Sequence, residues 1–174
     1  MKILGIAGYS GSGKTTLIEK IVPLLVETGL RVSLIKHAHH EFDVDHRGKD
    51  SWRHRKAGCA EVLVSSSLRW ALMHELHGDA EPTLDEQLRR LSPCDLVLVE
   101  GYKQDPIPRI EVHRAGGDRP LLFPDDPYVI AVATDEPLET RLPCFGLDDA
   151  PAISRFITEF VRASAGRRLS VASD

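Results

Sequence analysis

The chain has 174 residues, which is the usual size of a single folded domain. Hydrophobic residues make up 42% of it and charged residues 28%, a composition typical of a globular protein with its own core. The net charge of −4 argues against a nucleic-acid partner, and no apolar run approaches the length of a membrane span. Cys59, Cys94 and Cys144 are far apart, so we expect reduced thiols in a cytoplasmic protein.

The chain opens with an apolar segment and a glycine-rich loop. Residues 2–7 predict a buried strand, and residues 8–15 read G-Y-S-G-S-G-K-T, a full match to the phosphate-loop (P-loop) pattern G-x-x-x-x-G-K-[ST]. The glycines let such a loop curl until its backbone N–H groups point at one anion. Lys14 adds a charge for the β- and γ-phosphates, and the Thr15 hydroxyl can complete the shell of a Mg²⁺ ion.

An amphipathic helix is expected over residues 14–28, with Gly29 at its C-terminal end. The order of strand, loop and helix is the one that a P-loop requires, and it aims the positive end of the helix dipole at the phosphates. Pro23 falls inside this helix, where it removes one hydrogen bond and is expected to cause a kink.

A second strand is expected at 31–36, and a segment rich in histidine and basic residues follows it. Its histidines could bind a transition metal, although the tightly spaced cysteines or carboxylates of such sites are missing: His37, His39, His40, His46 and His54. We prefer a mobile cationic loop beside the γ-phosphate that also handles a second anionic substrate. Asp45 or Asp50 could then reach the Mg²⁺ shell, although Asp50 could equally cap a short helix over 50–57.

The rest of the chain alternates between strands and helices. Strands are expected at 61–66, 95–100, 107–113 and 128–133, and helices at 83–91 and 150–162. This alternation predicts an α/β fold of the P-loop NTPase type, with three layers and a mostly parallel sheet that has helices on both faces. Residues 69–76 do not fit it and could be an extra strand or a hairpin arm, which would either form a dimer contact or pack on its own domain. We expect one nucleotide-binding domain over 1–162 and a flexible tail over 163–174.

Two strands end in residues that could complete a nucleotide site, because ligands of open parallel sheets bind beyond the carboxyl ends of the strands. Glu100 ends one strand, where it could bind Mg²⁺ through water or orient an attacking water. Thr134 and Asp135 end another. The Asp135 carboxylate could accept hydrogen bonds from N1–H and N2–H₂ of guanine, which would favour GTP over ATP, or it could simply precede a turn.

These segments together resemble the molybdopterin-guanine dinucleotide biosynthesis protein B family. The stretches that carry the resemblance are G-Y-S-G-S-G-K-T-T-L, K-H-A-H-H with D-x-x-G-K-D-S-W-R-H-R-x-A-G, D-L-V-L-V-E-G-Y-K, R-I-E-V-H-R and A-V-A-T-D. It covers residues 2–162. Many families share the P-loop, whereas the histidine-rich block and E-G-Y-K are far more discriminating.

The resemblance implies a GTP-binding protein with weak Mg²⁺-dependent GTPase activity. Such proteins form homodimers and assist the guanylyltransferase that joins GMP to molybdopterin. It implies that Glu100, with Asp45 or Asp50, serves the metal, and that Thr134 and Asp135 contact the base. The residues implied to hold the phosphates, with Lys14 and Glu100 in catalytic roles, are Gly11, Ser12, Gly13, Lys14, Thr15 and Thr16. By charge and position, the candidates for contacting a pterin phosphate are Lys36, Arg53 and Lys103.

Two other functions stay open on the sequence. A small-molecule kinase would use residues 36–56 as a lid over its acceptor, but a long dedicated lid insert is missing. A nucleotide-regulated carrier or scaffold would present the pterin to a partner without needing hydrolysis. Arg47, Arg53 and Arg55 are the candidates for an intrinsic arginine finger, and without one a slow basal GTPase rate is expected.

Overall fold

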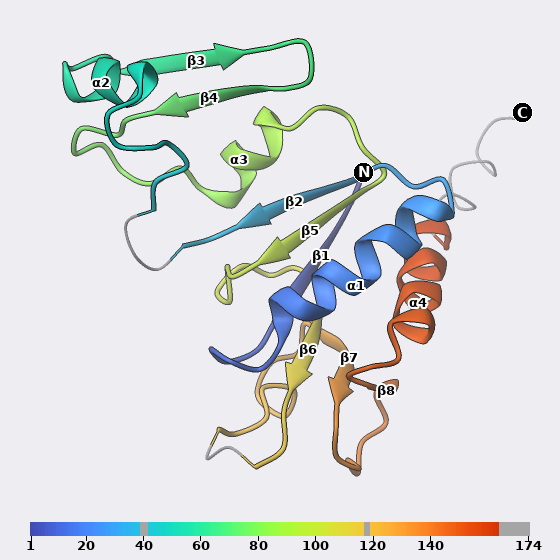
Figure 1. Ribbon diagram of the computed structural model, residues 1–174. Coiled ribbons are helices and arrows are strands. Elements are labelled where there is room, and N and C mark those ends of the chain that lie inside the picture. Colours follow the sequence, from blue (N-terminus) through green and yellow to red (C-terminus); the bar gives the residue numbers. More distant parts are fainter. Residues whose placement is uncertain (39–41, 117–118, 164–174) are drawn as a thin grey trace, which may run out of the picture. The chain divides into compact units, whose positions relative to one another are not determined.

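The computed structural model describes residues 1–38, 42–116 and 119–163 (Figure 1). The chain divides into two compact units. Unit 1 contains Met1–His37 and the chain from Gln87 onward, and unit 2 contains Ala38–Glu86. The stretch 1–162 that the sequence predicts as one domain contributes residues to both units. All but the first residue of the expected tail over 163–174 lie outside the described residues.

Unit 1 is built on a six-stranded sheet in which every neighbouring pair of strands is parallel. The strand order is β2-β5-β1-β6-β7-β8. In chain order the strands are β1 (Lys2–Ala7), β2 (Val32–Lys36), β5 (Leu96–Glu100), β6 (Arg109–His113), β7 (Val129–Thr134) and β8 (Cys144–Gly146). The mostly parallel α/β fold is thereby confirmed, and β1 lies in the interior of the sheet, so the P-loop leaves from its middle.

Two helices, α1 (Lys14–Glu27) and α4 (Ala150–Arg162), lie side by side against one face of this sheet (Figure 1). Alternate strand residues point to that face, as the period of two in a strand requires. The fully buried side chains between sheet and helices include Leu4, Ile6, Leu96, Leu98, Ile110, Leu17, Ile21, Ile153 and Ile157. The helix predicted over 150–162 therefore closes the core as expected, and Asp149 caps it by accepting the Ala152 N–H at 3.0 Å.

The intervening residues of β6 are charged or polar and nevertheless buried. Arg109, Glu111 and His113 are between 1% and 8% exposed. Glu111 accepts the backbone N–H groups of Leu122 and Phe123 at 2.7 and 2.9 Å, and His113 contacts Glu136 at 2.9 Å. Buried ionisable groups need such partners, so this side of β6 holds the loops of unit 1 in place by polar contacts.

Unit 2 contains a short helix, α2 (Asp50–Lys56), and a separate antiparallel hairpin of β3 (Glu61–Ser65) and β4 (Trp70–His74). The strand expected at 61–66 is therefore not part of the parallel sheet, and that part of the prediction was wrong. The connection of residues 66–69 is far too short for a parallel crossover and closes a hairpin instead. The alternative that residues 69–76 form a hairpin arm is confirmed.

Helices α2 and α3 begin in different ways, and one strand was not expected. Helix α3 (Leu84–Arg90) begins with a capping box, in which the Thr83 N–H donates to Glu86 at 2.8 Å and the Glu86 N–H donates to the Thr83 hydroxyl at 3.3 Å. Asp50 does not cap α2, because the cap position is Lys49 and Asp50 is already helical. The sequence also missed β8, a strand of only three residues with no alternating pattern.

Among the described helices, none is both long and apolar enough to span a membrane.

Candidate functional site

The P-loop connects β1 to α1 through a backbone path that needs glycine. Gly8, Gly11 and Gly13 have φ angles of 147°, 82° and 101°. A Cβ added to Gly8 would lie 2.4 Å from the Val112 carbonyl oxygen and 2.7 Å from the Ser12 Oγ. No side chain fits at that distance, so Gly8 allows the loop to pack against the end of β6.

The loop leaves several hydrogen-bond donors without partners. Helix α1 is capped by Gly13, which has no side chain to satisfy the first turn, and the N–H groups of that turn have no acceptor within the helix. The Ser12 Oγ is buried and has no hydrogen-bond partner among the described residues. Orphan donors around a cradle that a Cβ would fill suit an oxyanion such as a phosphate chain.

The Lys14 ammonium is held over this cradle. It donates to the carbonyl oxygens of Gly8 and Tyr9 at 3.1 and 2.9 Å. Burial lowers the pKa of Lys14 below its usual range, Glu100 opposes that shift, and the nearby Lys103 and Lys36 add to it. Several lysines repel one another in this site, and a bound anion stabilises their charged forms. The site therefore favours anion binding.

Glu100 is the last residue of β5, the strand next to β1, and it is only 8% exposed. Its carboxylate lies 3.5 Å from the Lys36 ammonium at the end of β2. The structure therefore brings Lys14, Lys36, Glu100 and Lys103 together at one edge of the sheet, as the sequence predicts. The Thr15 hydroxyl and the Glu100 carboxylate are oxygen ligands of the kind that Mg²⁺ prefers.

Asp135 also lies at this edge of the sheet, just past the end of β7. Its carboxylate accepts the Ala115 N–H at 2.6 Å and lies 3.7 Å from the Arg114 guanidinium. Thr134 is buried, and its hydroxyl accepts the Glu136 N–H at 3.2 Å, so it shapes the turn behind Asp135.

Arg114 belongs to the site although the sequence analysis did not single it out. Its Nη2 lies 3.5 Å from the position that a Cβ on Gly13 would take, so the side chain reaches from the end of β6 to the P-loop. Arg114 could have been predicted as a site residue, because it is the last residue of R-I-E-V-H-R and directly follows a buried strand.

The remaining predicted residues lie in unit 2, and their roles stay predictions. The Asp45 carboxylate accepts from the Ser51 hydroxyl at 2.9 Å and from Arg55 at 3.4 Å. Asp50 is exposed and lies 3.7 Å from Arg53. His39 and His40 lie outside the described residues, and the described part of the chain contains no group of three His, Cys, Asp or Glu residues placed to hold a metal ion.

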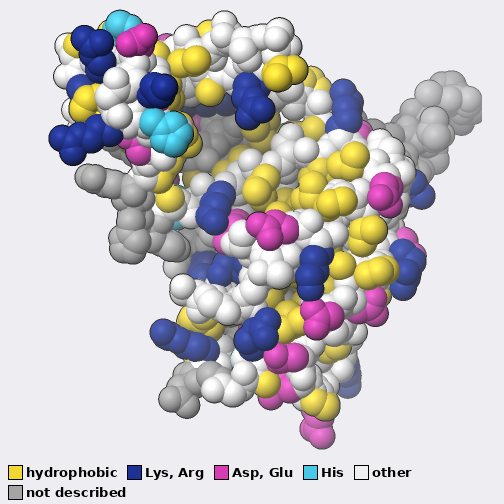
Figure 2. All heavy atoms as spheres, in the orientation of Figure 1, with side chains coloured by type: hydrophobic (Ala, Val, Ile, Leu, Met, Phe, Trp, Pro, Cys, Tyr) yellow, Lys and Arg dark blue, Asp and Glu magenta, His cyan; other side chains and the backbone are white. Residues whose placement is uncertain are grey.

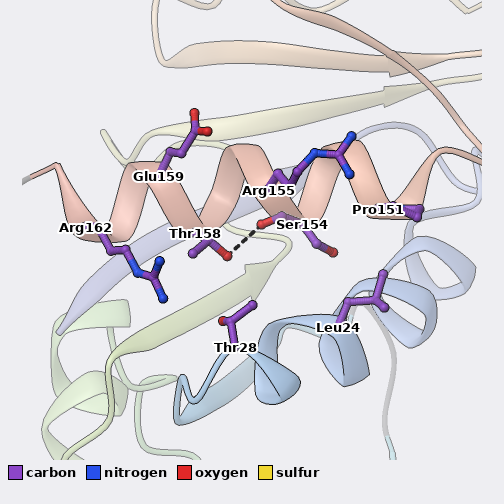
Figure 3. A pocket seen from close by; sticks show the side chains of 8 residues that line it. All are labelled: Leu24, Thr28, Pro151, Ser154, Arg155, Thr158, Glu159 and Arg162. Carbon is purple, nitrogen blue, oxygen red and sulfur yellow. Dashed lines mark hydrogen bonds between the residues drawn. The ribbon is translucent and has the colours of Figure 1, made fainter.

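Unit 1 has two notable cavities. One, of about 280 Å³, borders the P-loop and the end of β6, and its lining includes Tyr9, Ser12, Arg114 and Arg119. The other, of about 360 Å³, lies between α1 and α4, where Leu24 and Thr28 face the α4 residues Pro151, Ser154, Arg155, Thr158, Glu159 and Arg162 (Figure 3). The second cavity lies at the end of α1 opposite the P-loop, so it is separate from the candidate site.

Comparison with known proteins agrees with this geometry. The family model described as MobB, molybdopterin guanine dinucleotide synthesis protein B, matches residues 3–135. A molybdopterin-guanine dinucleotide biosynthesis adapter protein of Haemophilus influenzae is 46% identical, over 95% of this chain and 93% of that protein. The Escherichia coli protein of that name is 42% identical, over 94% and 95%. A crystal structure of molybdopterin-guanine biosynthesis protein B superposes with a TM-score of 0.73 at 31% identity, covering 92% of this chain and 99% of that one.

Proposed function

The chain belongs to the MobB family, and we propose that it is a GTP-binding adapter in the biosynthesis of molybdopterin guanine dinucleotide. The observation that carries the proposal is the P-loop cradle, in which Lys14 lies over unpartnered backbone donors within electrostatic range of Glu100. Relatives named as adapters in this pathway cover nearly the whole chain, which supports the same role here.

In the proposed complex, the P-loop holds the phosphates and the end of β7 reads the base. Thr15 and Glu100 would hold a Mg²⁺ ion, which would neutralise phosphate charge. Thr134 shapes the turn that presents Asp135 to guanine. The residues proposed to hold the phosphates are Gly11, Ser12, Gly13, Lys14, Thr15 and Thr16.

We propose that hydrolysis is slow and acts as a timer. Glu100 would orient the attacking water, and Lys14 would stabilise the charge on the leaving phosphates. Of the three arginines considered as fingers, Arg55 is already engaged, because it contacts Asp43, Asp45 and Glu75 at 2.7, 3.4 and 2.6 Å. A low basal rate suits an adapter that responds to its partners.

The proposed partners are the guanylyltransferase of the pathway and molybdopterin, in a cytoplasmic protein that acts as a homodimer. The positive charges of Lys36 and Lys103, two lysines near Lys14, support the binding of a second anion next to the nucleotide.

A reconstituted assembly assay with GTP, molybdopterin and the guanylyltransferase tests this function. The unmodified protein should raise the yield of the dinucleotide cofactor, and Lys14→Ala should remove that stimulation because it lowers nucleotide affinity by roughly 10- to 100-fold. Lys20→Ala is the matched control, since Lys20 is an exposed lysine of the same helix that pairs with Asp148 at 2.8 Å. Equal stimulation by Lys14→Ala and the unmodified protein would refute a role for nucleotide binding.

A further inference from the structure

A cluster beside the P-loop is not explained by nucleotide binding. The Lys103 ammonium lies 4.7 Å from the centre of the Tyr9 ring, and the Arg119 guanidinium lies 5.3 Å from it. The two cations come from different loops, one after β5 and one after β6, and Tyr9 comes from the P-loop itself. Three segments that are distant in sequence therefore converge on one ring.

The loop that carries Lys103 is strained and firmly held. Gly101 and Tyr102 have φ angles of 104° and 50°, a conformation that is costly for tyrosine and persists only where the surroundings enforce it. The Tyr102 ring lies 5.1 Å from the His37 ring, and its hydroxyl accepts a hydrogen bond from the Gln87 side chain. These contacts stabilise the strained backbone conformation, and they therefore fix the position of the neighbouring Lys103.

A buried arginine holds the rest of the same loop. Arg109, only 2% exposed, donates to the carbonyl oxygen of Lys103 at 2.7 Å and to that of Ile107 at 3.2 Å, and also to that of Asp105. It also lies 3.3 Å from the Asp126 carboxylate. Burying a guanidinium costs free energy unless its N–H groups are hydrogen-bonded. Here the hydrogen bonds of Arg109 hold the loop that carries Lys103.

Lys103 and Arg119 both contact the Tyr9 ring, which does not neutralise their charges. Among the described residues, no carboxylate lies at salt-bridge distance from Lys103 or Arg119, whereas Lys36 is paired with Glu100. An aromatic ring attracts a cation but leaves its charge available to a further ligand. Figure 2 shows Lys and Arg side chains at the end of unit 1 where the P-loop lies. The cavity of about 280 Å³ that Tyr9 and Arg119 help to line gives a ligand room.

We propose that Tyr9, Lys103 and Arg119 form a second anion-binding subsite, which takes a phosphate monoester of a molecule other than the nucleotide. The subsite rests on the proposed function, because its position matters only if the P-loop beside it holds GTP. Lys103 and Arg119 bind the phosphate oxygens, and Tyr9 keeps both cations in place and offers its ring to an apolar or planar part of the ligand. A nucleotide and a second phosphate ester would then be bound side by side.

Calorimetry with phenyl phosphate as the probe tests this subsite. The protein is first saturated with Mg²⁺ and β,γ-imido-GTP, so that the P-loop is filled. Phenyl phosphate should still bind, and Lys103→Ala and Arg119→Ala should each weaken it by about tenfold or more. Lys103→Arg and Tyr9→Phe should retain it, because charge and ring are kept. Lys20→Ala is the control for a general loss of positive charge on unit 1.

Two outcomes would overturn the subsite. One is the absence of phenyl phosphate binding to the saturated protein, and the other is mutual displacement of phenyl phosphate and β,γ-imido-GTP, which would assign the two cations to the nucleotide. Titration of nucleotide-free Lys14→Ala separates the two proposals. If the unmodified protein fails to bind GTP while Lys14→Ala still binds phenyl phosphate through Lys103 and Arg119, the proposed function fails and the anion subsite stands.

Discussion

Single glycines decide whether the chain can bring its functional groups together. Gly101 follows Glu100 directly, and a Cβ added there would lie 2.7 Å from the Cβ of His37, so the ends of β5 and β2 can approach only because this side chain is absent. Gly29 also has a positive φ, of 86°, but a Cβ added to it would meet nothing within 4 Å. A side chain at Gly29 would cost only the free energy of the backbone conformation, whereas one at Gly101 would also cost the free energy of a steric clash.

Gly29→Ala should therefore lower the free energy of unfolding by about 1–2 kcal/mol, the usual cost of a left-handed residue with a Cβ. Gly101→Ala should lower it by about 1–3 kcal/mol more, because the methyl group also displaces His37. Urea unfolding of the nucleotide-free variants measures both values. Equal destabilisation by the two substitutions would show that His37 moves aside without cost.

Local patterns made most elements of unit 1 predictable. The P-loop, the strands that end at Glu100 and Thr134, and the helix over 150–162 each have a motif or a hydrophobic period within a short window. Glu100 could be placed beside Lys14 because parallel strands present their carboxyl ends at one edge of the sheet.

What could not be predicted depends on pairing between distant segments. The charged residues of β6 interrupt an apolar pattern, and their burial follows only from the loops that return to pair with them. Tyr9 and Arg119 are far apart in sequence, and no local period connects them. The alternative in which Asp50 caps α2 is wrong. The sequence could not decide it, because Asp is common both at helix caps and in the first turn of helices.

In unit 2, one arginine organises the segment around α2 and the hairpin. The Arg55 side chain is 9% exposed and contacts the three carboxylates of Asp43, Asp45 and Glu75. The Asp45 N–H and Arg55 lower the pKa of Asp43 below its ordinary value of 3.8. A carboxyl whose pKa is lowered by folding stabilises the folded state above its unfolded pKa, and that contribution is lost as the pH falls through the lowered value.

Unit 2 should consequently lose stability on acidification below the ordinary carboxyl pKa. Arg55→Met should destabilise unit 2 at neutral pH, because three carboxylates are left without their cation. It should also reduce the acid-induced loss without removing it, because the Asp45 N–H still lowers the pKa of Asp43. Both tryptophans, Trp52 and Trp70, lie in unit 2, so tryptophan fluorescence during urea unfolding at a series of pH values reports on it. Arg53→Met is the matched control. An unchanged pH profile in Arg55→Met would contradict this role.

At the scale of the whole molecule, the hairpin offers an exposed apolar surface for self-association. Leu63 and Leu72 are paired across the two strands and are 61% and 48% exposed, and Trp70 on β4 is 67% exposed. An uncovered apolar strand face of this kind is an association site in many proteins.

Leu72→Lys combined with Trp70→Ser should therefore convert the proposed homodimer to a monomer, because the face becomes polar and charged. Sedimentation equilibrium of the full chain measures the change. Glu61→Gln, on the same hairpin, is the control, since it leaves the apolar face intact. A dimer that persists in the double variant would place the interface elsewhere.

We propose above all that the P-loop binds Mg²⁺-GTP and that Asp135 selects guanine. Calorimetric titration with GTP and ATP, with and without Mg²⁺, tests it most directly when it is repeated on Asp135→Ala. GTP should bind the unmodified protein more tightly than ATP, and Asp135→Ala should weaken GTP by roughly 10- to 100-fold while leaving ATP unchanged. A preference for ATP in the unmodified protein, or the same GTP affinity in Asp135→Ala, would contradict the account.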